Sequence, residues 1–343
     1  MTFTAVRSIT DVTPFRNLQS SAEFLQQLGE PAWIVIEGED ASRCRVIVTL
    51  LHGNEPSGTE ATLALIREGF KPKVTTWILI ASVKTALEEP LFSHRMLKGN
   101  PDLNRCFSHK LGKQDTKVHH FAELIAADIA LLQPEAVIDV HNTSGDGPGF
   151  CVATSSSSYR ELLEPFANLF AQTLVMTDIH LGALMEHDFG GPIITVECGG
   201  NRSNESHQLA YDGFKRYMSL DKIEDMPRVN KFTTYRHPLR LEIKEGYYLN
   251  YASDHQLGSD LTLRHDIEQL NFGTTSPNEN LGWLGPEGLR GLQVVDTDGV
   301  DHIDEYFIVK ENELHARHKL HLFMVTKNLE IAVSDCLFYF CEV

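Results

Sequence analysis

The chain has 343 residues, and its 47 Asp and Glu outnumber its 30 Lys and Arg, which gives a formal net charge of −17. This acidic balance argues against a nucleic-acid-binding protein, because such a protein needs a basic face to replace phosphate counterions. Hydrophobic residues make up 42 % of the chain, enough for a packed core and too many for a disordered acidic chain. The length predicts about two domains.

Both the N-terminal segment and the cysteines predict a cytoplasmic protein. The segment MTFTAVRSITDVTPFRNL lacks the basic start, the apolar run and the cleavage site of a signal peptide. No apolar stretch approaches the roughly 18 residues that cross a bilayer. The six cysteines contain no CxxC pair and are interpreted as reduced thiols. We therefore expect neither a membrane nor a nucleic-acid partner, and the sequence leaves open whether the chain forms a homo-oligomer.

Residues 33 to 220 predict an α/β layer, in which short apolar strands alternate with amphipathic helices around a largely parallel sheet. Several apolar runs lack strict alternation, as expected for strands that are covered on both faces. A helix over His119–Leu132 is predicted from apolar residues at helical spacing. The predicted strands are WIVIEG from Trp33, CRVIVTLL from Cys44, TTWILIASV from Thr75, AVIDV from Ala136, GFCVAT from Gly149 and PIITVE from Pro192.

The sequence changes in character after about residue 221, where the segment DKIEDMPRVN is polar and contains a proline. The segments that follow alternate apolar and polar residues between Gly, Pro, Asn and Asp, a pattern typical of strands and turns. We therefore expect a catalytic α/β domain over residues 1–222 and a mostly β domain over residues 223–343.

The spacing His-x-x-Glu is a weak metal-binding signal, because it occurs four times in this chain, at His52, His120, His265 and His302. Context favours the first. His52 and Glu55 follow the buried-looking strand RVIVTLL, and open α/β sheets place their ligand sites at the carboxyl ends of such strands. Pro56 then begins a predicted helix.

His141 has the same location, at the end of the strand AVIDV. Two imidazoles and one carboxylate, with a fourth position open to water, are the ligands of a catalytic zinc site. The sequence therefore predicts one zinc ion per chain, bound by His52, Glu55 and His141.

Two further segments carry candidate site residues. Glu197 ends the strand PIITVE, where its carboxylate could act as a general base beside metal-bound water or accept bonds from the following amides. In the loop SHRMLKGNPDLNRCF, Asn104 and Arg105 suit a substrate carboxylate, and Arg95 suits a developing oxyanion.

The motifs HGNE at 52–55, DLNRCF at 102–107, DVHNT at 139–143 and VE at 196–197 occur in one order along the chain. In this order and context the sequence resembles the succinylglutamate desuccinylase/aspartoacylase family, a zinc-carboxypeptidase-like group. The resemblance covers about residues 45–205, and a β-rich tail domain is expected after it.

The resemblance implies a role for each matched residue. His52, Glu55 and His141 would bind zinc, and Glu197 would activate its water. Asn104 and Arg105 would hold a substrate carboxylate, while Arg95 would polarise the scissile carbonyl. Asp102 would accept a hydrogen bond from a zinc-bound histidine and so fix its tautomer and orientation.

One departure from the family concerns the substrate. Aspartoacylases carry an arginine ten residues before the catalytic glutamate, where this chain has His187. A histidine would hold a second carboxylate less firmly than a bidentate arginine, so aspartoacylase activity is not favoured. The sequence does not decide whether His187, or a tyrosine among Tyr247, Tyr248 and Tyr251, reaches the substrate.

The function that we expect is a zinc-dependent hydrolase that cleaves the amide bond of an N-acyl amino acid or a similar small anionic carboxylate. One alternative is a zinc carboxypeptidase acting on short peptides. Another is a non-catalytic module that binds zinc or a carboxylate, although a structural site would normally close its fourth position with protein.

Overall fold

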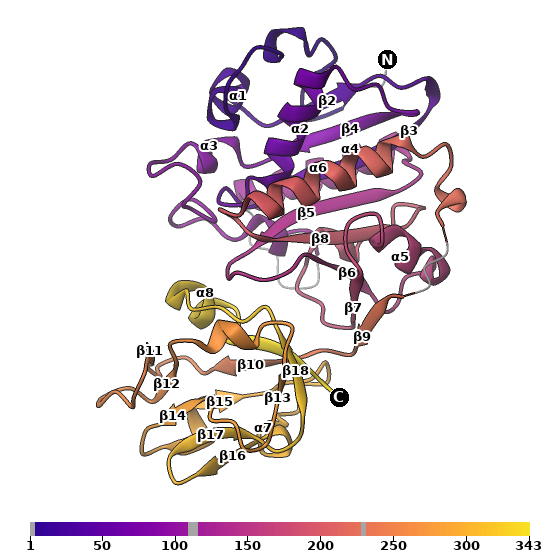
Figure 1. The fold of residues 1–343 in the computed structure, drawn as a ribbon. Helices are drawn as coiled ribbons and strands as arrows, with labels where there is room; N and C mark the ends of the chain where they lie inside the picture. The colour runs from indigo at the N-terminus through magenta and orange to yellow at the C-terminus, as the bar shows by residue number, and fades with distance from the viewer. Residues whose placement is uncertain (1–3, 109–115, 228–230) are drawn as a thin grey trace. The chain divides into compact units, whose positions relative to one another are not determined.

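The computed structural model describes residues 4–108, 116–227 and 231–343. These residues divide into two compact units (Figure 1). Unit 1 consists of residues 1–142, 149–176 and 180–234, and unit 2 consists of residues 143–148, 177–179 and 235–343. Within the described ranges, no helix combines the length and the apolar character that crossing a bilayer requires.

A nine-stranded sheet forms the centre of unit 1, with the order β1-β2-β4-β3-β5-β8-β6-β7-β9. The pairs β1–β2, β3–β4 and β3–β5 are parallel, whereas β2–β4 and β6–β8 are antiparallel. The prediction of an α/β fold with a mixed, largely parallel sheet is therefore confirmed. The strands are β1 Ser8–Ile9, β2 Ala32–Ile36, β3 Asp40–Thr49, β4 Val74–Ile80, β5 Val137–Thr143, β6 Phe150–Thr154, β7 Thr173–Thr177, β8 Ile193–Gly200 and β9 Thr233–Arg236.

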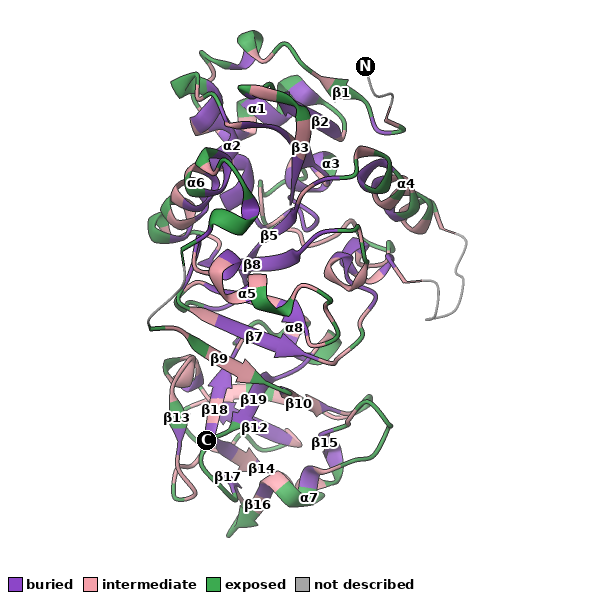
Figure 2. Cartoon of the chain, turned by 90° about the vertical axis from the view of Figure 1, so that its right-hand side faces the viewer, coloured by how far each residue is buried: buried purple, intermediate pink, exposed green. Residues whose placement is uncertain are grey.

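Helices cover both faces of this sheet, with α2 and α6 on one side and α4 on the other (Figure 2). Successive strand residues point to opposite faces, so Ile47 joins the core beneath α2 and α6, while Val46 and Val48 join the core beneath α4. This double burial explains the continuous apolar runs of the sequence. The helices of unit 1 are α1 Ser21–Leu28, α2 Ser57–Glu68, α3 Val83–Ala86, α4 Lys117–Leu132, α5 Arg160–Ala167 and α6 Asn204–Ser219.

Unit 2 is mostly β and contains two five-stranded sheets, ordered β13-β18-β19-β10-β15 and β11-β12-β14-β17-β16. The two sheets share one apolar core, in which Phe307 of β16 packs edge-on against Phe340 of β19 with ring centroids 5.4 Å apart. The strands are β10 Leu239–Ile243, β11 Leu249–Ala252, β12 Leu261–Arg264, β13 Thr274–Thr275, β14 Gly282–Leu284, β15 Leu292–Gln293, β16 Phe307–Lys310, β17 Glu313–Ala316, β18 Leu320–Phe323 and β19 Phe338–Glu342, and the helices are α7 Ile303–Tyr306 and α8 Leu329–Ser334.

Candidate metal centre

Three neighbouring strands in the middle of the unit 1 sheet carry the candidate site. Their order is β3-β5-β8, and β3 runs parallel to β5 with Thr49 opposite Val140. His52 lies just after β3, His141 lies in β5 and Glu197 lies in β8. Strand order therefore gathers residues that are far apart in the sequence.

Two glycines, Gly53 before α2 and Gly58 in its first turn, allow this part of the chain to pack closely against its neighbours. A Cβ on Gly53 would lie 2.7 Å from the Cβ of Thr85, and a Cβ on Gly58 would lie 2.0 Å from Thr49 Oγ1. Both distances are far below van der Waals contact, so a larger residue at either position would displace the segment that carries Glu55.

The helix start predicted at Pro56 is confirmed, because Pro56 is the N-cap of α2.

His52, Glu55 and His141 bring their ligand atoms to one point. Glu55 Oε1 lies 2.8 Å from His52 Nδ1, and Glu55 Oε2 lies 2.7 Å from His141 Nδ1. The two Nδ1 atoms are 3.2 Å apart. All three side chains are buried, and each offers a ligand atom within 4.8 Å of the others, a grouping that can hold a metal ion.

A carboxylate lies behind each imidazole ring. Asp102 Oδ1 is hydrogen-bonded to His52 Nε2 at 2.8 Å, and Asp139 Oδ2 lies 2.9 Å from His141 Nε2. The Asp139 contact has the distance of a hydrogen bond but not its angles, and the Asp139 oxygens have no hydrogen-bond partner among the described residues. Because a carboxylate bonded to Nε2 keeps the proton there, Asp102 leaves the Nδ1 lone pair of His52 facing the cluster, and Asp139 lies at the corresponding position behind His141.

The charges of this cluster fit one divalent cation. The carboxylates of Glu55, Asp102 and Asp139 and the guanidinium of Arg95 sum to −3 + 1 = −2. Buried charge of one sign is costly unless it is compensated. Although burial alone would lower the pKa of His141, the carboxylates of Asp139 and Glu55 hold it well above its usual value. The same negative potential that favours a proton there also favours a metal ion.

Glu197 is a buried carboxylate beside this cluster. Burial raises the pKa of Glu197 to about 7, and the charge of Glu55 adds to the rise, whereas charges on His141, His52 and Arg95 oppose it. Glu197 Oε2 has no hydrogen-bond partner among the residues that the structure describes. A carboxylate whose pKa lies near neutral pH and whose oxygen has no hydrogen-bond partner has the properties of a general base.

The DLNR segment lies against the cluster. The Nε and Nη2 atoms of Arg95 both lie 2.9 Å from Asp102 Oδ2, and its Nη1 lies 3.4 Å from Glu55 Oε1. Asn104 is buried, with its Nδ2 3.3 Å from His141 Nε2 and its Oδ1 accepting a hydrogen bond from Leu184 N. Arg105 donates to the Asn104 carbonyl and is half-buried. The structure thus brings Arg95, Asp102 and Asn104 to the candidate site.

Beside this segment lies a cavity of about 360 Å³, to which Arg95 contributes. Its other lining residues are mainly apolar and include Leu51 and Leu103, the sequence neighbours of His52 and Asp102. Among the candidate site residues only Arg95 lines this cavity, and the proposed metal ligands and Glu197 do not.

Asp139 is one residue at this site that the sequence reasoning missed. Asp139 lies two positions before His141 on β5, and strand residues two apart point to the same face. The signal was present in the sequence as an acidic residue in an otherwise apolar run, at the spacing that sets it beside the histidine.

Comparison of the sequence with known protein families and with curated proteins finds no match. Solved structures do match. A succinylglutamate desuccinylase from Vibrio cholerae aligns with a TM-score of 0.57 at 14 % identity, over 95 % of each chain. The corresponding enzyme from Vibrio parahaemolyticus aligns with a TM-score of 0.55 at 14 % identity, over 90 % of this chain and 85 % of that one. Murine aminoacylase 3 aligns with a TM-score of 0.53 at 13 % identity, over 89 % of this chain and 96 % of that one.

These identities are too low to carry an activity from one chain to another, but the alignments span most of every chain. They agree with the resemblance that four sequence motifs indicate. The chain therefore has the fold of the succinylglutamate desuccinylase/aspartoacylase family.

Proposed function

We propose that the chain is a zinc-dependent hydrolase that cleaves the amide bond of an N-acyl amino acid or a similar small carboxylate. The observation that carries this proposal is the convergence of His52 Nδ1, His141 Nδ1 and the Glu55 carboxylate beside the buried Glu197. Three protein ligands leave a fourth position for water or substrate, which is the arrangement of catalytic rather than structural zinc sites.

Zinc bound by these ligands would supply a water of lowered pKa and a Lewis acid for the scissile carbonyl. Glu197 takes a proton as the water oxygen forms its bond to the carbonyl carbon. Glu197 then returns this proton to the amine nitrogen as the carbon–nitrogen bond breaks. The products are a carboxylic acid and a free amine, so one group acts as base and then as acid.

Three residues of the loop before α4 would position the substrate. Arg105 presents a guanidinium fork suited to a carboxylate, and Asn104 adds a neutral donor beside it. Arg95, which already lies next to Glu55, would stabilise negative charge on the carbonyl oxygen. Asp102 holds both Arg95 and the ring of His52, so one carboxylate would position a ligand and a polarising group together.

His187 bears on which amino acid is released. Its Nε2 is hydrogen-bonded to the Phe107 carbonyl, and its ring stacks on Phe189 with centroids 5.5 Å apart. Because a carbonyl oxygen only accepts hydrogen bonds, His187 Nε2 carries a proton and donates it to this carbonyl. His187 therefore offers no free fork for a second carboxylate, and we propose that acylated aspartate is not the preferred substrate.

The structural neighbours support the reaction class. The two Vibrio enzymes are called succinylglutamate desuccinylases and the murine one aminoacylase 3, names that describe removal of an acyl group from an amino acid. We further propose that residues 1–222 form the catalytic α/β domain and residues 223–343 a mostly β C-terminal domain.

The metal prediction is tested by thermal unfolding. The purified chain should contain one zinc per chain, and free zinc at about 100 times its dissociation constant should stabilise the fold by about 2.7 kcal/mol over the apo form. His141→Ala should lose this stabilisation. His120→Ala is the matched control, because His120 also belongs to a His-x-x-Glu pair but is exposed and 3.7 Å from Glu123. Equal stabilisation of all three proteins by zinc would contradict the assigned ligands.

The role of Glu197 is tested by Glu197→Gln, which keeps the size of the side chain and removes the base. We expect kcat to fall by about 10²- to 10⁴-fold with zinc content unchanged. Asp128→Asn serves as control, because Asp128 is another buried carboxylate, bonded to Trp33 Nε1 and the amide of Val6. That control should lower stability and leave kcat near the wild-type value. Unchanged turnover in Glu197→Gln would remove Glu197 as the base.

The substrate class is tested with a panel of N-acetyl and N-succinyl amino acids, N-acetylaspartate and short peptides. We expect the highest kcat/KM for an N-acyl amino acid without a side-chain carboxylate. Cleavage restricted to peptides would replace the proposed substrate, and preference for N-acetylaspartate would refute the argument from His187.

A further inference from the structure

We propose that Asn142 is a positioning residue that holds the two metal-ligand segments, residues 52–57 and β5, and the end of β8 with the general base in register. This inference rests on the proposed metal site but concerns a residue that neither binds the metal nor contacts the substrate in that proposal. Asn142 is 4 % exposed, and its polar groups make four hydrogen bonds to two other segments of unit 1, one with Glu55 and Ser57 and one with Gly199.

The side-chain amide of Asn142 bonds in one orientation only. Its Oδ1 accepts from Ser57 N at 3.1 Å, and its Nδ2 donates to the Gly199 carbonyl at 2.9 Å and to Ser57 Oγ at 2.8 Å. Exchanging oxygen and nitrogen would set a donor against Ser57 N and an acceptor against the Gly199 carbonyl. A side chain with both a donor and an acceptor is therefore required here.

Asn142 and its side-chain partners each lie within two residues of a proposed functional residue in the sequence. Asn142 follows His141 directly, Ser57 comes two residues after Glu55, and Gly199 comes two residues after Glu197. The backbone amide of Asn142 also lies within 3.3 Å of Glu55 Oε2 and donates to it. One buried side chain thus links β5, the start of α2 and the end of β8.

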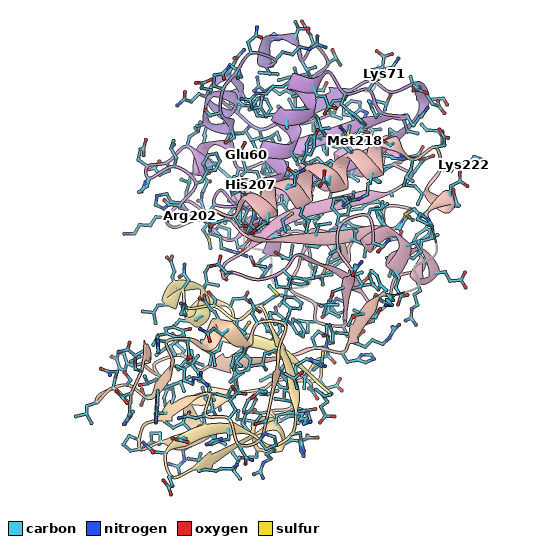
Figure 3. All side chains as sticks on the ribbon, viewed as in Figure 1. Glu60, Lys71, Arg202, His207, Met218 and Lys222 are labelled. Carbon is cyan, nitrogen blue, oxygen red and sulfur yellow. The ribbon has the colours of Figure 1, made fainter. Side chains whose placement is uncertain are left out.

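The linkage continues to α6, on the same face of the sheet as α2. Ser57 Oγ receives a hydrogen bond from Asn142 and is also hydrogen-bonded to His207 Nδ1, which lies 2.8 Å away. His207 is labelled on α6 in Figure 3. The ordered contact fixes Ser57, which is itself fully buried.

Asn142→Asp is the sharpest test, because it keeps the shape of the side chain while a carboxylate oxygen replaces the donor NH₂. The new carboxylate oxygen would face the Gly199 carbonyl and separate β8 from β5. We expect the zinc dissociation constant, measured by competition with a chromogenic chelator, to rise about 10- to 100-fold. The visible absorption of the cobalt-substituted protein should change, and kcat should fall with KM near the wild-type value.

Asn271→Asp is the matched control. Asn271 of unit 2 also donates to a carbonyl, that of Asp146, and accepts from a backbone amide, that of Val325. This control should lose stability without a change in zinc affinity or cobalt spectrum. Ser57→Ala, a milder variant that keeps the Asn142 bonds to Ser57 N and Gly199, should shift zinc affinity in the same direction by a smaller factor.

The outcomes separate this inference from the proposed function. If the wild-type chain binds zinc and turns over substrate while Asn142→Asp keeps its zinc affinity, cobalt spectrum and kcat, the positioning role is refuted and the function stands. If Asn142→Asp and Asn271→Asp weaken zinc equally, the effect is general destabilisation and the inference also fails. If the wild-type chain binds no zinc, the proposed function itself fails.

Discussion

The structure of the site depends on one interaction, the close approach of two imidazole nitrogens, His52 Nδ1 and His141 Nδ1, to the buried carboxylate of Glu55. Such acceptor atoms repel one another unless a proton or a cation lies between them, and burial removes the water that would otherwise satisfy them. The cost of gathering His52, Glu55 and His141 is therefore offset only when positive charge is present. Asp102 and Asp139, each behind one ring, keep either histidine from relieving the repulsion by turning its other nitrogen inward.

The alternation of strand β5 shows how the fold meets this constraint. Val137 faces the core beneath α4, and Asp139 and His141 follow it on the same side of the strand. Ile138 and Val140 face the core beneath α2 and α6, and Asn142 follows on that side. One strand thus presents a proposed ligand and its carboxylate partner on one face and the residue that links α2 to β8 on the other.

Much of this arrangement could be predicted from the sequence, because strand ends in α/β sheets gather polar residues. His52, Glu55 and His141 were recognised at such ends. The order β3-β5-β8, however, is set by pairing between distant segments, and no local pattern reveals it. Asp139 is not evident from the sequence, because the segment AVIDV as a whole predicts a buried strand. Asn142 is not evident either, because its partners Ser57 and Gly199 are far away in the sequence. The contact of Arg95 with Glu55 and Asp102 likewise depends on how a long loop folds back.

Anomalous X-ray scattering at the zinc absorption edge, from crystals of the zinc-loaded protein, tests the central claim most directly. The account predicts an anomalous peak bonded to Nδ1 of His52, Nδ1 of His141 and the Glu55 carboxylate, with Asp102 and Asp139 on the opposite ring nitrogens. A peak ligated through Nε2 of either histidine would contradict the proposed role of those carboxylates. Absence of a peak at this cluster would contradict the metal centre itself.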